Sequence, residues 1–206
     1  MIEFARFPQD VGAFDRLVGQ VERVIDTGRR LPDWPLRHQS TANVDVCQFS
    51  HAIEGAFGSV LESLADHHGD RVVTALVLEP APAYYREHYG GFSAFSLPRE
   101  AVADAYWDCV SFEPDDDPTG AVTFTANVVA ITGDSREWAV WAERVWDLAI
   151  VLSTTADGPW LSQDVPFVPI DEALTDFTES DFKTPLSPAA RSTFLENYGS
   201  RPEPTP

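Results

Sequence analysis

Lysine is almost missing from this chain of 206 residues, and basic side chains of any kind are scarce. The sequence has 33 aspartates and glutamates against 14 lysines and arginines, so the formal net charge is −19, and Lys183 is the single lysine. A surface of this charge repels the phosphates of nucleic acids and anionic lipid headgroups. Because no run of basic residues interrupts it, we expect no nucleic-acid partner and no binding to a membrane surface.

Cysteines and long apolar runs are also few. Cys47 and Cys109 lie far apart, so no framework of several disulfides is indicated. No stretch approaches the roughly 18 apolar residues of a membrane-spanning helix. The first residues, MIEFARFPQDVG, are interrupted by charge and proline and do not resemble a secretory leader. These features predict a cytoplasmic protein with reduced thiols.

Sequence signatures of catalysis or cofactor binding are absent. There is no G-x-S-x-G, Walker or G-x-G-x-x-G pattern, and Cys47 is followed by His51 without an identifiable third group. His67, His68 and Asp70 are metal-ligand types, but adjacent histidines at a helix end point in diverging directions. We therefore expect no catalytic residue, no cofactor and no resident metal.

The acidic stretch DDDPTGAVTFTA departs from a calcium-binding loop at its last position. Asp115, Asp117, Thr119 and Gly120 fill the first, third, fifth and sixth places, but Ala126 stands where a bidentate glutamate is needed. A strand-like run also replaces the helix that should follow. We interpret the stretch as an acidic turn, and weak calcium binding stays open.

Hydrophobic spacing predicts helices that alternate with strands. We expect a single α+β domain over residues 1–199, with a disordered tail at 200–206. An antiparallel sheet of about five strands would be built around the hairpin 121–152, with helices packed on one face. The segment 81–98, rich in tyrosine and phenylalanine, is predicted to be a packed loop that ends in a short strand.

Three of the six tryptophans, Trp138, Trp141 and Trp146, fall within nine positions of the predicted hairpin. Residues three apart on a strand point to opposite faces of a sheet, so Trp138 and Trp141 do not form one flat platform. We interpret them as two-sided packing of a central strand. A ligand or partner surface is the alternative.

The densest acidic stretch is DVPFVPIDEALTDFTESD, residues 164–181, which contains no basic residue. Its acids would surround an apolar ridge formed by Phe167, Ile170, Leu174 and Phe177. Such a surface suits a basic protein partner, because opposite charge speeds encounter and aromatic side chains anchor the contact. A solvated acidic helix is the simpler alternative. The predicted partner-binding residues are Asp164, Phe167, Asp171, Glu172, Asp176, Phe177, Glu179 and Asp181.

These observations favour a non-catalytic binding protein that holds or inhibits a basic protein partner, as immunity-type inhibitors of toxins do. Two alternatives stay open. One is a small-molecule enzyme in which His88 or a buried carboxylate performs acid–base chemistry. The other is an assembly subunit whose exposed aromatic side chains close an oligomer. The enzyme's pocket would be lined by Tyr84, Tyr85, Tyr89, Phe92 and Trp107.

Overall fold

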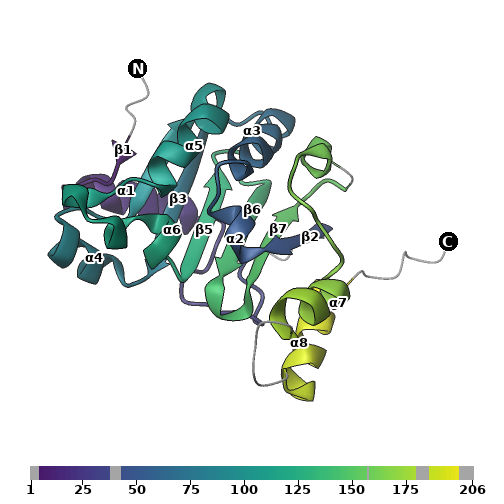
Figure 1. Cartoon of the computed structure of the whole chain (residues 1–206). Helices are drawn as coiled ribbons and strands as arrows, with labels where there is room; N and C mark the ends of the chain where they lie inside the picture. Colours follow the sequence, from purple (N-terminus) through teal and green to yellow (C-terminus); the bar gives the residue numbers. More distant parts are fainter. Residues whose placement is uncertain (1–4, 38–42, 157, 180–185, 200–206) are drawn as a thin grey trace.

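The computed structural model describes residues 5–37, 43–156, 158–179 and 186–199, and the structural statements below concern these ranges. Seven strands form one sheet in the order β1-β4-β3-β5-β6-β7-β2, and all neighbours are antiparallel (Figure 1). The predicted α+β fold is therefore confirmed, with more strands than the expected five. The strands are β1 (Ala5–Arg6), β2 (Asn43–Gln48), β3 (Val72–Glu79), β4 (Ala94–Pro98), β5 (Val128–Gly133), β6 (Trp138–Glu143) and β7 (Leu148–Ser153).

Helices connect most of these strands. None of those in the described ranges is long and apolar enough to cross a membrane. The predicted tail at 200–206 lies outside the described residues. A π-helix, Leu174–Glu179, directly follows α7, and short 3-10 turns fill several loops. The α-helices are α1 (Val11–Val21), α2 (Phe49–Ala52), α3 (Phe57–His67), α4 (Pro82–Tyr89), α5 (Val102–Val110), α6 (Val122–Thr125), α7 (Ile170–Ala173) and α8 (Pro188–Tyr198).

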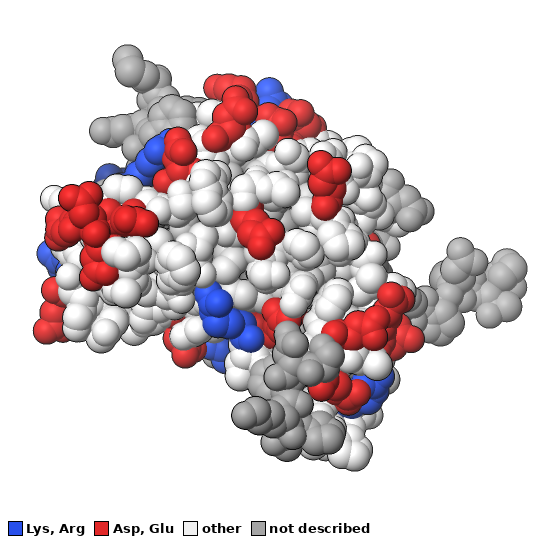
Figure 2. Space-filling model, in the orientation of Figure 1, with Lys and Arg blue, Asp and Glu red and all other residues white. Residues whose placement is uncertain are grey.

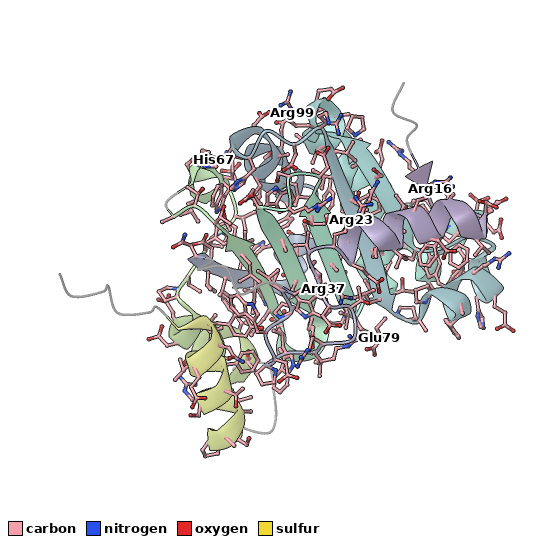
Figure 3. All side chains as sticks on the ribbon, turned by 180° about the vertical axis from the view of Figure 1, so that it is seen from behind. Arg16, Arg23, Arg37, His67, Glu79 and Arg99 are labelled. Atoms are coloured by element: carbon pink, nitrogen blue, oxygen red, sulfur yellow. The ribbon has the colours of Figure 1, made fainter. Side chains whose placement is uncertain are left out.

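The helices cover both faces of the sheet, and not one face as we expected. Helices α2, α3 and α5 pack on the front face in Figure 1, whereas α1, α7 and α8 pack on the back, which Figure 3 shows. The reason lies in the central strands, since every residue of β5, β6 and β7 is buried. Runs such as VVAITG and LAIVLS are apolar at almost every position, and such strands are stable only between two covering layers.

Two segments differ from the predicted secondary structure. The hairpin was expected to begin at residue 121, but Val122–Thr125 form the short helix α6 and β5 begins at Val128. The backbone N–H groups of Thr125 and Ala126 donate to the carbonyls of Ala121 and Val122, at 2.9 and 3.0 Å, as in a helical turn. The predicted loop at 81–98 contains α4, which begins at Pro82 and ends before a left-handed glycine.

The tryptophans of β6 pack into the interior on opposite faces, as predicted. Trp138 lies in the front core and Trp141 in the back core, and each is at most 1% exposed. Each indole N–H donates to a buried carboxylate: Trp138 Nε1 to Asp70 Oδ2 at 2.6 Å, and Trp141 Nε1 to Glu143 Oε1 at 2.7 Å. The rings are therefore scaffold, with their polar atoms paired inside the protein.

Glu143 connects the back core to the loop that follows α1. Its Oε1 accepts hydrogen bonds from Trp141 Nε1 and from the backbone N–H of Leu31, both at 2.7 Å. Burial raises the pKa of Glu143 above its ordinary value, although these two hydrogen bonds and nearby Arg30 act in the opposite direction. Because both donors bond to Oε1, Oε2 is the oxygen that carries the proton when the carboxyl group is protonated.

We expect Glu143→Gln to leave the free energy of unfolding within about 1 kcal/mol of wild type at pH 7, because the amide oxygen still accepts both bonds. Glu143→Ala leaves both donors unpaired and should lower it by about 3 kcal/mol. The raised pKa means that the folded wild-type protein binds the proton more tightly than the unfolded chain. Its stability should therefore fall as pH rises from the ordinary carboxyl pKa through the raised one.

Denaturant unfolding between pH 4 and pH 8 measures both effects, and the Gln variant should lack the pH component due to this residue. Equal losses in the Gln and Ala variants, or identical pH profiles for wild type and Gln, would contradict the assignment.

Candidate functional site

The predicted acidic segment is exposed on one side. Glu179 is half-buried, and its Oε1 lies 3.3 Å from Nη1 of Arg191 on α8. Asp181 lies outside the described residues. Figure 2 shows acidic side chains gathered beside α7. The exposed acids of the segment are Asp164, Asp171, Glu172 and Asp176.

The apolar residues of this segment point inwards and do not form an exposed ridge. Ile170 and Leu174 are buried in the back core, while Phe167 and Phe177 are half-buried against the front and back cores respectively. Ile170, Leu174 and Phe177 follow the spacing of one helical face, and that face packs on the sheet. The aromatic anchors expected for a partner are therefore largely used by the fold, and the acids form the accessible surface.

A groove of about 790 Å³ opens beside β2, the last strand of the sheet; we call it the β2 groove. β2 pairs with β7 on one side, and on the other it meets one residue of the following segment, where Val168 N donates to Val46 O at 2.8 Å. Backbone groups of alternate residues point to the same side of a strand, so those of Val44 also face the groove. The lining residues are Val44, Asp45, Leu161, Gln163, Asp164, Val165, Pro166, Phe167, Val168 and Pro169.

The charge of the β2 groove is entirely negative. Asp45 and Asp164 are its charged lining residues, and none of the described lining residues is basic. Helix α7 packs next to β2 and adds the exposed carboxylates of Asp171 and Glu172 nearby. Apart from Gln163, the remaining lining residues are valine, leucine, proline and phenylalanine. The groove therefore combines apolar walls with an acidic rim.

Trp160 holds the outer wall of the β2 groove in place. Its indole is fully buried, and Nε1 donates to Asp45 Oδ2 at 3.1 Å. The rings of His67 and His68, at the end of α3, lie with centroids 5.5 and 6.0 Å from it. This contact attaches the turn Pro159–Ser162 to the edge strand and to the front layer.

The aromatic residues expected to line a substrate pocket do not surround a common cavity. Tyr85 is buried, and its hydroxyl donates a hydrogen bond to a backbone carbonyl. Tyr84 is half exposed and stacks on His88, with the two ring centroids 3.8 Å apart. Phe92 belongs to the back core beneath α1, and Trp107 is exposed on α5. Burial also raises the pKa of Tyr85 far above its ordinary value, so its hydroxyl stays protonated.

The nucleophilic side chains singled out in the sequence are enclosed. Cys47 is fully buried in β2, and burial raises the pKa of its thiol far above neutrality. Burial likewise raises the pKa of Cys109 to about 11. His68 Nε2 lies 3.0 Å from Ser153 Oγ, and burial followed by the charge of His67 lowers the pKa of His68. Ser153 is only 1% exposed, so this pair is closed to a substrate.

The acidic stretch at 115–117 lies in a turn that is held by hydrogen bonds to the carboxylate of Asp117. Asp117 accepts hydrogen bonds from the Oγ1 and backbone N–H of Thr119, at 2.7 and 2.9 Å, and these bonds lower the pKa of Asp117. Asp115 and Asp116 have φ angles of 53° and 58°. In the described part of the chain, no three histidine, cysteine or acidic side chains are grouped so that they could hold a metal ion.

Comparisons of this chain with known protein families, with curated proteins and with solved structures found no match.

Replacing Trp160 by phenylalanine removes the donor to Asp45 and part of a buried ring, and should lower the free energy of unfolding by about 2 kcal/mol. Trp107→Phe is the matched control, because this indole is 48% exposed and should change stability by less than about 0.5 kcal/mol. Amide exchange at Val168 should also accelerate in the Trp160 variant, since its bridge to β2 loses support. Equal effects of the two substitutions would show that Trp160 does not hold the groove wall.

Proposed function

We propose that this chain is a non-catalytic binding protein that holds a basic segment of another protein in the β2 groove. One observation supports this proposal above the others: the open edge of the last strand faces a groove whose charged lining residues are acidic. The acidic surface expected from the sequence is part of this binding site. It places the recognition of the partner at the strand edge, with the acids of α7 beside it.

The backbone of β2 supports binding of an extended segment. An edge strand presents unpaired N–H and C=O groups, and a peptide that adds to the sheet satisfies them. Val44 supplies such groups next to the single bridge at Val46. Alternate side chains of the bound segment would then face the apolar wall and the solvent-exposed rim.

Charge supports a basic segment over a neutral or acidic one. Asp164, Asp171 and Glu172 are exposed at or beside the groove, and the whole chain carries a net charge of −19. Arginine or lysine side chains that reach this rim gain complementary potential, and the long-range field speeds their approach. If the bound segment belongs to the partner's own binding surface for a polyanion, its capture inhibits the partner.

A display library of random 12-residue peptides tests the choice of ligand. Peptides selected on wild type should be rich in arginine and lysine alternating with apolar residues, and Asp164→Lys/Asp171→Lys/Glu172→Lys should bind them at least about tenfold more weakly. The matched control, Glu100→Lys/Asp104→Lys/Asp108→Lys, changes the net charge equally on exposed residues of the α5 region and should retain most of the affinity. Selected peptides without basic residues, or equal losses in the two triple variants, would refute the proposal.

Val44→Pro tests the backbone pairing separately. Proline removes the outward N–H of Val44 and leaves its pairing with β7, a position at which edge strands tolerate proline. We expect the thermal unfolding midpoint to change little while affinity for the selected basic peptides falls at least about tenfold. Undiminished peptide affinity in a folded Val44→Pro protein would contradict strand addition at this edge.

A further inference from the structure

A second hollow, of about 370 Å³, lies on the back of the sheet where α1 ends; we call it the arginine hollow. Three arginines and one aspartate supply its charges, in a chain that has 14 basic and 33 acidic residues. Figure 3 shows Arg23 at this end of α1, over the sheet. The local charge is therefore opposite in sign to that of the whole protein. The lining residues are Gln20, Arg23, Arg71, Val72, Thr74, Thr132, Gly133, Asp134 and Arg136.

One of the three arginines is neutralised within the hollow. Arg71 donates through Nε and Nη2 to Asp134 Oδ2, at 3.0 and 2.8 Å, and Asp134 Oδ1 accepts from the backbone N–H groups of Arg71 and Val72. Partial burial of Asp134 acts to raise its pKa, but these hydrogen bonds outweigh it and hold the pKa below the ordinary value. The aspartate is thus committed to Arg71 and does not compensate the other two cations.

Arg23 and Arg136 carry the uncompensated charge. Both are exposed, and neither forms an ion pair with another residue in the described ranges. They come from different segments, one just after α1 and one from the turn between β5 and β6. Two guanidinium groups that meet at one hollow, in a protein of high negative charge, are suited to bind an anion between them.

The floor of the arginine hollow is polar, although it belongs to the sheet interior. Thr74 and Thr132 face each other across β3 and β5, and they are 3% and 1% exposed. Thr74 Oγ1 donates to Gln20 Oε1 at 2.7 Å, which leaves the amide nitrogen of Gln20 available as a donor. Thr132 Oγ1 donates to the backbone carbonyl of Trp138 at 2.7 Å, so both threonine hydroxyl hydrogens are used within the protein. An anion that enters the hollow therefore meets the amide nitrogen of Gln20 as a donor at its base, and the cations at its rim.

The turn that carries Arg136 is held in place from the front of the sheet. Asp70 accepts a hydrogen bond from the backbone N–H of Ser135 and another from Trp138 Nε1. A Cβ atom on Gly133 would collide with the Asp70 carboxylate, so only glycine permits this close approach. Arg136 itself has a φ of 71°, a left-handed conformation that its surroundings maintain.

We propose that the arginine hollow is a binding site for a phosphate group, carried by a small molecule. Guanidinium groups pair with phosphate oxygens through two parallel N–H···O bonds, and the volume of the hollow accommodates a small ligand and not a protein segment. The site is separate from the β2 groove and does not depend on the function proposed for that groove.

Titration with inorganic phosphate at constant ionic strength, with chloride as the balancing anion, tests this site. Phosphate should raise the thermal unfolding midpoint of wild type and shift the amide signals of Gly133 and Val72 in nuclear magnetic resonance spectra. Arg23→Gln and Arg136→Gln should each weaken binding about tenfold or more. Without phosphate, both variants should unfold at the wild-type temperature, because neither arginine forms an ion pair in the described structure.

Arg16→Gln is the matched control, since it removes the same charge from α1 seven residues before Arg23 and is not part of the hollow. It should weaken phosphate binding by less than about threefold, because the solvent screens a charge at that distance. Phosphate binding no stronger than that of chloride would overturn the proposal. An equal loss in Arg16→Gln, or binding of the dicarboxylate succinate in preference to phosphate, would also overturn it.

Discussion

The pairing of buried indole N–H groups with buried carboxylates is the constraint on which the rest of this structure depends. A tryptophan in a dry interior needs an acceptor for its N–H, and a carboxylate there needs donors, because either group left alone strongly destabilises the fold. This chain satisfies both needs together, on both faces of the sheet and at its edge. Trp138 pairs with Asp70 and Trp141 with Glu143, and both carboxylates are only 1% exposed. At the edge, the buried indole of Trp160 pairs with the half-buried carboxylate of Asp45.

Each pair also fixes a segment outside the sheet. Asp70 holds the turn that carries Arg136, and thereby shapes the arginine hollow. Glu143 holds the loop after α1 through the backbone N–H of Leu31. Asp45 holds Trp160 and with it the outer wall of the β2 groove. Both candidate binding surfaces therefore depend on polar contacts inside the core, and two such surfaces with opposite charge can coexist in one small acidic protein.

Regular spacing explains what could be predicted from the sequence. The alternation of helices with strands and the opposite orientations of Trp138 and Trp141 follow from local periodicity. The covering of both sheet faces could also have been predicted, from the unbroken apolar runs of β5 and β7. The helical spacing of Ile170, Leu174 and Phe177 likewise could have predicted that the apolar side of the acidic segment faces inwards. The arginine hollow could not be predicted from the sequence. Its arginines lie at positions 23, 71 and 136, and only the fold brings these distant positions together.

Hydrogen exchange of the indole N–H groups measures the central constraint most directly. If the indole–carboxylate bonds hold the sheet together, Nε1–H of Trp138 and Trp141 should exchange with solvent only when the whole protein unfolds, while that of the half-exposed Trp107 exchanges rapidly. Exchange of Trp138 or Trp141 at a rate close to that of Trp107, under conditions in which the sheet amides stay protected, would contradict the account.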